Sequence, residues 1–367
     1  MQFSISREAL LKPLQMVSGV VERRQTLPVL SNVLLVLKGS ELSLTGTDLE
    51  VELIGRVQVE GSPKSGEITV PARKLLDICK SLSDDSALEV SVTDNKLKLK
   101  SGRSRFTLAT LPASEFPNVD EEPDTFSLVI SQARLRELLE ATSFAMAQQD
   151  VRYYLNGMLF EVGADYLRVV ATDGHRLAME TLNIASTVKE TQQLILPRKG
   201  IMELSRLLSD EGGDIELTFG QNHIRAAIPE FTFTSKLVDG KFPDYNRVLP
   251  KGGDRVLSGA CQELRQAFSR ASILSNEKYR GVRVILSDGE MRIYANNPEQ
   301  EEAEEIVSVD YDAEALEIGF NVSYLIDVLS TITSERVKIT LSDPNSSALL
   351  EAEEGSDALY VVMPMRL

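Results

Sequence analysis

The sequence has 367 residues, of which 43% are apolar, and a formal net charge of −16. This length predicts two or three domains, and because no apolar run approaches the roughly 18 residues that span a bilayer and no signal peptide opens the chain, we expect a cytoplasmic protein without membrane contact. The two histidines and two cysteines lack metal-binding spacing, so we expect no metal and no other cofactor, and the negative charge argues against binding by general phosphate neutralisation.

The first predicted elements are a helix at residues 9–14, a strand ending in a polar turn at 44–48, and a second helix opening at 70–74. The same patterns return twice. Helices are predicted at 134–139 and 263–268, turns at 170–174 and 294–298, and second helices at 196–200 and 320–324. The turns and second helices recur with offsets of 124 to 126 residues, which predicts a triplicated domain.

Strands such as 88–92 and 96–100 alternate apolar and polar residues, which predicts antiparallel sheets with one solvated face. We therefore predict an α+β fold of three tandem domains, 1–125, 126–252 and 253–367, with polar linkers near 120–127 and 249–256 and helices on one sheet face. The net charges of these domains are −3, −2 and −11. The acidity belongs to the last domain.

Two features allow a chemical interpretation. Asp173 and His175 could form a general-base pair, but no nucleophile motif accompanies them, and the equivalent turns carry Asp48 and Asn297 without a histidine. A structural turn is the alternative. Cys79 and Cys261 lie in apolar helical patterns and are interpreted as buried, reduced thiols.

Four segments carry a resemblance: 149–157, 172–177, 296–305 and 360–367. They are similar to the beta subunit family of bacterial DNA polymerase III, and the likeness runs end to end. The resemblance implies three clamp domains per chain, antiparallel sheets outside and helices lining a channel, and a head-to-tail homodimer that closes a ring around DNA. It implies a non-catalytic processivity factor that binds double-stranded and primed DNA without sequence specificity. Its implied partners are the DNA polymerase III alpha subunit, the clamp-loader delta subunit, other polymerases and mismatch-repair proteins.

A ring holds DNA topologically, so overall acidity is compatible with this function, and basic groups could offset the charge of the channel locally. We expect them to include Lys12, Lys74, Arg136, Arg198, Lys199 and Arg265. For direct DNA contact, the resemblance and the presence of hydrogen-bond donors favour Arg24, Arg73, Gln149, Tyr153 and Tyr154. The alternative for the two tyrosines is a half-buried place in a strand.

The resemblance also implies a partner-peptide pocket between the second and third repeats. Its predicted members are Leu155, Thr172, Gly174, His175, Arg176, Leu177, Pro243, Arg247, Val248, Tyr324, Ser347, Val361, Val362, Met363, Pro364, Met365, Arg366 and Leu367. Methionines in the last five residues suit a groove that accepts several partners. The alternative for these residues is a frayed tail.

The acidic run 299–305 could be a solvated loop, but the first repeat carries a complementary basic strip of Lys96, Lys98, Lys100, Arg103 and Arg105. Opposite charges at the two ends of one chain would set the register of a head-to-tail dimer. The predicted interface consists of Lys74, Ile78, Leu82, Arg103, Arg105, Phe106, Leu108, Ile273, Leu274, Glu299, Glu301, Glu302, Glu304 and Glu305.

Two functions of other classes compete with a clamp. A hydrolase would use His175 and Asp173, but the sequence supplies no third catalytic member. A DNA-binding regulator would need a recognition helix or a base-reading basic cluster, and none stands out.

Overall fold

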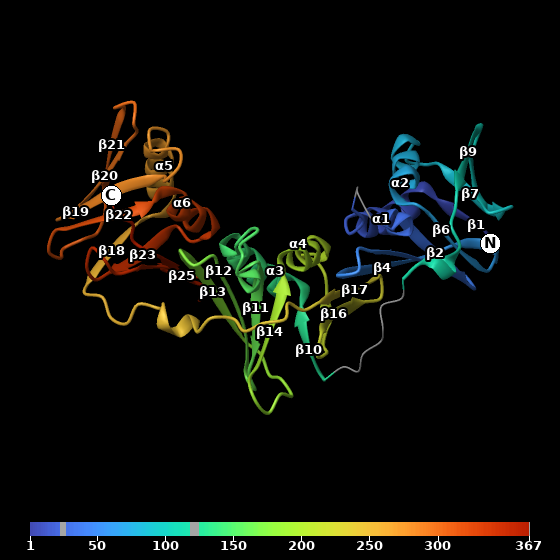
Figure 1. Ribbon diagram of the computed structural model, residues 1–367, viewed down its shortest axis with the longest axis horizontal. Helices are drawn as coiled ribbons and strands as arrows, with labels where there is room; N and C mark the ends of the chain where they lie inside the picture. The colour runs from blue at the N-terminus through green and yellow to red at the C-terminus, as the bar shows by residue number, and fades with distance from the viewer. Residues whose placement is uncertain (23–26, 118–124, 367) are drawn as a thin grey trace. The chain divides into compact units, whose positions relative to one another are not determined.

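The computed structural model describes residues 1–22, 27–117 and 125–366. Within these residues each repeat runs strand, helix, four or five strands, helix and three strands. The helices are α1 (Arg7–Ser18), α2 (Ala72–Ser81), α3 (Gln132–Thr142), α4 (Arg198–Leu207), α5 (Cys261–Ser272) and α6 (Val322–Thr331) (Figure 1). They confirm the predicted pair of helices in every repeat. The strand that opens each repeat was not predicted.

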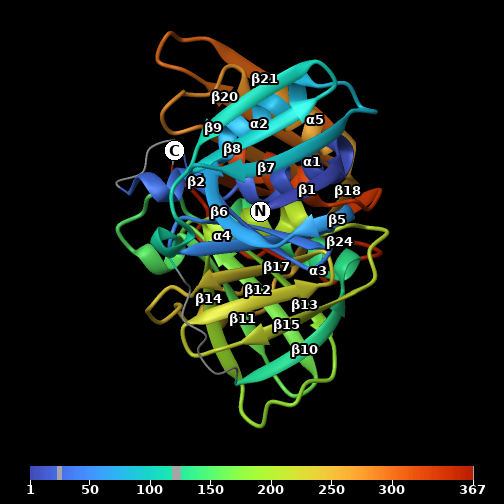
Figure 2. The same cartoon turned by 90° about the vertical axis from the view of Figure 1, so that its right-hand side faces the viewer.

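The chain forms two compact units, and the first contains residues 1–133 and 199–237. Its five-stranded sheet has the order β5 (Glu60–Lys64), β1 (Gln2–Ser6), β7 (Ala87–Thr93), β8 (Lys96–Ser101), β9 (Ser104–Ala109) (Figure 2). Its eight-stranded sheet has the order β10 (Phe126–Ser131), β15 (Asp214–Phe219), β16 (His223–Ile228), β17 (Phe231–Lys236), β4 (Val51–Gln58), β3 (Glu41–Thr47), β2 (Asn32–Lys38), β6 (Gly66–Pro71).

The second unit contains residues 134–198 and 238–367. Its eight-stranded sheet has the order β14 (Gln192–Pro197), β11 (Gly157–Val162), β12 (Tyr166–Thr172), β13 (Arg176–Asn183), β25 (Leu359–Val362), β24 (Ala348–Ala352), β23 (Arg336–Leu341), β18 (Arg255–Ala260). Its four-stranded sheet has the order β21 (Glu302–Ser308), β20 (Glu290–Asn296), β19 (Gly281–Ser287), β22 (Leu316–Asn321).

The two large sheets explain why three sequence repeats give two compact units. In the first unit β4 pairs with β17, and in the second β13 pairs with β25, so strands from different repeats join one sheet. The pairs that join β4 to β17 and β13 to β25 are antiparallel, as are the other pairings in these sheets, which confirms the predicted sheet type. The predicted limits of the domains follow the sequence repeat, whereas the compact units follow sheet continuity.

Helix α1 shows how a repeat builds its core. Ser6 caps its start, accepting a hydrogen bond from the Ala9 backbone N–H at 3.2 Å, and buried Leu10, Leu14 and Val17 repeat at helical spacing. The helix packs on α2 and on β3 and β4. The equivalent helix of the third repeat, α5, packs on α6, β20 and β21.

Cys79 and Cys261 are buried and form no disulfide, as the sequence indicated. Burial raises the pKa of the Cys79 thiol to about 11, so this group is a packing residue at neutral pH. In the described residues, no helix has the length and apolar character needed to cross a membrane.

Candidate functional site

A cavity of about 220 Å³ lies in the second unit, at the start of β13. Its lining is mainly apolar, with Leu155 and Leu177 as buried members. Nine predicted pocket residues line it: Leu155, Thr172, Gly174, Arg176, Leu177, Pro243, Val248, Val361 and Met363. Four lining residues were missed by the pocket prediction: Arg152, Tyr154, Asp244 and Tyr245. A concave, largely apolar site with a few polar groups is typical of ligand binding.

The turn between β12 and β13 forms one rim of this cavity. The Thr172 hydroxyl donates to the Arg176 carbonyl at 2.6 Å and accepts from the Gly174 N–H at 3.0 Å. Gly174 has a φ of +90°, which favours glycine. Asp173 Oδ1 accepts from the backbone N–H groups of His175 and Arg176, at 2.9 and 3.1 Å. The structural-turn interpretation of Asp173 is therefore confirmed.

The same contacts argue against an Asp–His catalytic pair. The second oxygen of Asp173 accepts from Arg176 Nε at 3.2 Å. The His175 ring is stacked near Tyr324, with 6.3 Å between the ring centroids. The carboxylate thus orients backbone and guanidinium groups, and in the described residues it makes no hydrogen bond to the imidazole.

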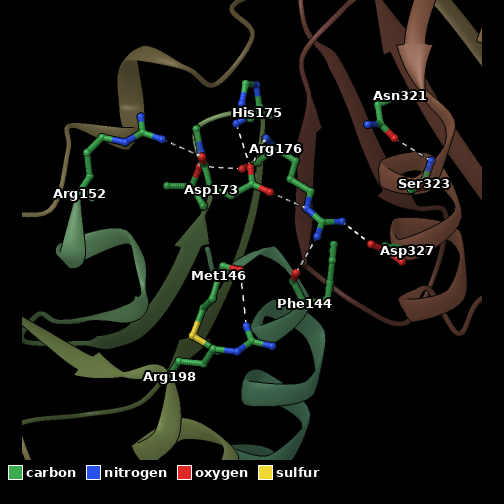
Figure 3. A network of polar contacts seen from close by, with 12 residues as sticks. Phe144, Met146, Arg152, Asp173, His175, Arg176, Arg198, Asn321, Ser323 and Asp327 are labelled. Carbon is green, nitrogen blue, oxygen red and sulfur yellow. Dashed lines mark hydrogen bonds and ion pairs between the residues drawn. The ribbon is translucent and has the colours of Figure 1, made fainter. Parts of the chain in front are cut away.

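Arg176 ties the turn to helix α6 (Figure 3). Its guanidinium donates to the Asp327 carboxylate and, at 2.8 Å, to the Phe144 carbonyl. It also lies over the rings of Tyr324 and Phe144, at 4.7 and 5.2 Å from their centroids. Such contacts hold the rim residues of the cavity in one arrangement.

Arg152 holds the opposite side of the turn. It donates to the Asp173 carbonyl at 3.2 Å and forms an ion pair with Asp150 at 2.8 Å. The hydrogen bonds from Arg152 lower the pKa of Asp150 to about 2. Arg152 and Arg176 therefore both donate to Asp173, one to its carbonyl and the other to its carboxylate (Figure 3).

A buried polar network supports the wall that contains Tyr245. Its hydroxyl donates to Glu161 Oε1 at 2.8 Å and accepts from Arg168 at 3.0 Å. Gln193 donates to the other Glu161 oxygen at 2.6 Å. Because every acceptor of the buried carboxylate has a partner, the network fixes the position of Tyr245.

The sequence matches the domains of one known protein family along almost its whole length. Models of the N-terminal, central and C-terminal domains of the DNA polymerase III beta subunit match residues 1–120, 129–244 and 246–366. The chain belongs to the DNA polymerase III beta subunit family. A beta sliding clamp of Pseudomonas putida is 64% identical, and that of Escherichia coli K12 is 51% identical, each over the full length of both chains. The crystal structure of a DNA polymerase sliding clamp from Pseudomonas aeruginosa superposes with a TM-score of 0.97 at 63% identity, with both chains fully covered.

Family membership gives the three repeats the identity of tandem clamp domains in an α+β fold. The function is that of a non-catalytic processivity factor of the bacterial replicative polymerase. The hydrolase and regulator alternatives are therefore excluded.

The remaining pocket residues predicted from the family lie outside the lining of the cavity. They are His175, Arg247, Tyr324, Ser347, Val362, Pro364, Met365 and Arg366. Val362 is fully buried and lies on the opposite face of β25 from Val361, because alternate strand residues face opposite ways. The Arg247 side chain is 85% exposed and pairs with Asp244. The position of Leu367 is outside the described residues.

Residues that follow β25 are held in place. The Met363 N–H donates to the His175 carbonyl at 3.0 Å, and the Met365 N–H donates to the Gly319 carbonyl at 2.8 Å. Met363, Pro364 and Met365 are half-buried. The alternative of a frayed tail is therefore wrong for these residues.

The residues predicted to contact DNA are placed as follows. Arg73 is exposed in the first turn of α2, and Gln149 is exposed in a loop with a φ of +56°. Tyr153 is 57% exposed, whereas Tyr154 is half-buried and lines the cavity. Both tyrosines lie in the 3₁₀ turn Tyr153–Leu155, so the alternative of a strand position is wrong. Arg24 lies outside the described residues.

Two of the expected channel cations are engaged by carboxylates. Lys199 donates to Asp48, whose side chain is buried, and pairs with Glu22 at 2.7 Å. Arg136 pairs with Glu140 at 2.7 Å. Their charge is partly compensated within the chain, and the expectation that these two offset the charge of a channel stays a prediction.

Two edge strands carry six of the predicted interface residues: Arg105, Phe106 and Leu108 on β9, and Glu302, Glu304 and Glu305 on β21. Strand β9 pairs only with β8, and β21 pairs only with β20, within the described residues. Phe106 and Leu108 share the inner face of β9 with Leu99 of β8, whereas Arg105 shares the outer face with Lys100. On β21, Glu302 and Glu304 share the outer face with Tyr294, and Glu305 lies on the inner face.

Glu305, on the inner face of β21, is not a free charge of an exposed acidic strip, because its carboxylate is paired within the chain. Arg270 of α5 binds both oxygens of Glu305, at 2.8 and 2.7 Å. Ile273, directly after α5, is 74% exposed, and Ile306 is exposed on the outer face of β21 beside Glu304. Lys74, Ile78 and Leu82 lie on or directly after α2, with Lys74 exposed and the other two half-buried.

Proposed function

We propose that this clamp acts as a head-to-tail homodimer that encircles double-stranded and primed DNA, and that its cavity at the start of β13 is the shared docking site for partner proteins. The observation that carries the proposal is the cavity itself, apolar in its depth and rimmed by Thr172, Arg152 and Arg176. The expected partners are the DNA polymerase III alpha subunit, the clamp-loader delta subunit, other polymerases and mismatch-repair proteins.

The chemistry of the cavity suits short linear motifs with apolar anchors and a polar side chain such as Gln. Leu155, Leu177 and Val361 offer apolar contact area. The rim supplies hydroxyl and guanidinium donors for the backbone or amide groups of a peptide. A single cavity of about 220 Å³ can hold the apolar anchor residues of one peptide at a time. Partner proteins are therefore expected to compete for it.

The edges of the small sheets support the dimer. Pairing of β9 of one protomer with β21 of another would satisfy two rows of backbone groups. It would also bring Phe106 and Leu108 near Ile273 and Leu274 on the inner side, and Lys98, Lys100 and Arg105 near Glu302 and Glu304 on the outer side. An apolar centre with a charged rim is typical of specific interfaces.

For DNA contact we retain Arg24, Arg73, Gln149 and Tyr153, and we assign Tyr154 mainly to the pocket because it lines the cavity. We propose the domain limits 1–125, 126–252 and 253–367, since they follow the sequence repeat. A cytoplasmic, nucleoid-associated location follows from the proposed action on replicating DNA.

The docking proposal is tested by deleting residues 363–367. The deletion removes Met363 from the cavity and its hydrogen bond to His175, but leaves the edge strands intact. We expect the truncated protein to remain a dimer, and its affinity for a Gln-containing partner peptide to fall by at least tenfold, measured by isothermal titration. Replacing the exposed Met202 of α4 by Ala is the matched control. Full-strength peptide binding by the truncated protein would place the docking site elsewhere.

A further inference from the structure

Strand β13 carries a carboxylate on the face opposite to the peptide pocket. Leu177 and Met179 belong to the apolar cluster beside the pocket, so Glu180 projects to the other side of the sheet. Ala178 pairs with Tyr360 of β25, which places Tyr360 on the same face as Glu180. Their exposed fractions are 2% for Tyr360 and 5% for Glu180. The sheet thus buries an acidic group and a phenol side by side.

Two cavities of about 540 and 480 Å³ meet at this carboxylate. Both are lined by Glu180, Arg134, Ala352, Gly355 and Ser356. We call the two cavities together the acidic basin. The first is also lined by Glu137, Glu140, Ile332 and Tyr360. The second is also lined by Glu351, Glu353, Glu354 and Asp357.

Glu180 lacks a bonded partner. In the described part of the chain its carboxylate has no hydrogen bond or ion pair, and the nearby Arg134 is paired with Glu137. Burial raises the pKa of Glu180, with Arg134 lowering it and Glu137 and Asp357 raising it further. A buried carboxylate without a partner is costly, and a ligand that supplies a cation would remove that cost.

The fold itself does not require this carboxylate. Thr47 pairs with Glu52 in the first repeat as Thr172 pairs with Leu177 in the second, so the position equivalent to Glu180 is Gly55. A Cβ atom on Gly55 would lie 2.9 Å from Cβ of Pro13 in α1. In the first repeat Gly55 therefore packs tightly against α1. In the second repeat the same position holds Glu180, which lines a cavity.

We propose that the acidic basin binds a small aliphatic diamine or polyamine, with one ammonium group at Glu180 and a second near Asp357. An ammonium offers three donors to carboxylate and phenol oxygens. Ile332, Ala352 and the ring of Tyr360 can contact the methylene chain. A metal ion fits less well, because in the described residues no three His, Cys, Asp or Glu side chains lie so that they could hold a metal ion together. This site lies apart from the peptide pocket and does not depend on it.

The proposal is tested by titrating 1,5-diaminopentane into the full-length protein at pH 8 and about 50 mM salt, where surface attraction is still partly screened. We expect saturable binding of one molecule per chain, at least tenfold weaker in Glu180→Gln. Glu190→Gln, which removes one exposed charge from the same unit, is expected to bind as the wild type does. The uncharged 1,5-pentanediol is expected not to bind.

Two further measurements separate binding from folding. Without diamine, Glu180→Gln is expected to unfold at a higher temperature than the wild type, because it removes a buried charge. Diamine is expected to raise the unfolding temperature of the wild type only, and peptide binding is expected to stay unchanged in both proteins. Absence of saturable diamine binding to the wild type, or equal loss of binding in the two variants, would overturn the proposal, the second by showing a diffuse attraction to the acidic surface.

Discussion

Tyr245 is the residue through which the buried network of Glu161 reaches the peptide pocket. We expect Tyr245→Phe to lower the free energy of unfolding by about 1–2 kcal/mol, because two hydrogen bonds are lost. We also expect peptide affinity to fall several-fold, because the wall can shift. Chemical unfolding and peptide titration measure the two effects.

Tyr166→Phe is the matched control for this prediction. The Tyr166 hydroxyl also binds Glu161, at 3.1 Å, but Tyr166 does not line the cavity. Its substitution is expected to cost stability and leave peptide affinity unchanged. Equal loss of affinity in both variants would contradict a specific role for Tyr245.

Glu52 of β4 gives the first unit a pH dependence. Burial raises the pKa of Glu52 to about 7 from an ordinary 4.5, against the opposing effect of Arg225. Between these two values the folded protein holds a proton that the unfolded chain releases, so stability falls as pH rises through this window. We expect Glu52→Gln to flatten this fall, with a gain of at most about 3 kcal/mol at pH 8.

Urea unfolding at pH 5 and pH 8 measures this difference. Glu50→Gln, at an exposed neighbouring position, is expected to keep the wild-type pH dependence. A parallel pH dependence in wild type and Glu52→Gln would show that other groups cause it.

The sequence predicts those site residues that leave a local signal and misses those that are placed by contacts distant in the chain. Turn residues such as Thr172 and Asp173 are recognisable because their side chains bond locally. Asp244 and Tyr245 reach the pocket from the start of a single 3₁₀ turn, which is too short for a periodic pattern to show which way its side chains point. The division of the acidic run into an outer Glu304 and an inner Glu305 depends on the register of β21 with β20, which the sequence does not specify.

At the scale of elements, the edges of β9 and β21 are the predicted dimer contacts. We expect the double substitution of Ile273 and Leu274 by Ala to give folded monomers that leave circular DNA, because the apolar centre of the interface is lost. Sedimentation at nanomolar concentration and retention on closed circular DNA provide the measurements. Val129→Ala, at an exposed site on β10, is the control. A full dimer of the double variant would refute this interface.

At the scale of the whole molecule, loading onto DNA depends on charge at a few positions. Reversal of Arg24 and Arg73 to Glu is expected to reduce retention on primed circular DNA severalfold at about 150 mM salt, because phosphate contacts are lost. Dimer formation is expected to be unaffected. Lys80→Glu, exposed in the last turn of the same helix α2, is expected to have a smaller effect. Unchanged loading of the Arg24/Arg73 variant would remove these residues from the DNA-contact set.

The repeat offset makes the order of elements predictable from sequence, because each copy repeats the same turn and helix signals. The joining of repeats into shared sheets is not predictable in this way. It depends on the pairing of β4 with β17 and of β13 with β25. The two strands of each pair lie far apart in the chain.

The central position of β25 has a consequence for synthesis on the ribosome. β25 lies between β13 and β24 and supplies Val361 to the pocket, yet it follows β13 by about 180 residues. At a synthesis rate of roughly 5–20 residues per second, about 10 to 40 s pass between the synthesis of β13 and that of β25. A nascent chain therefore has no complete pocket to offer, and partner proteins can recognise only molecules whose translation has passed β25.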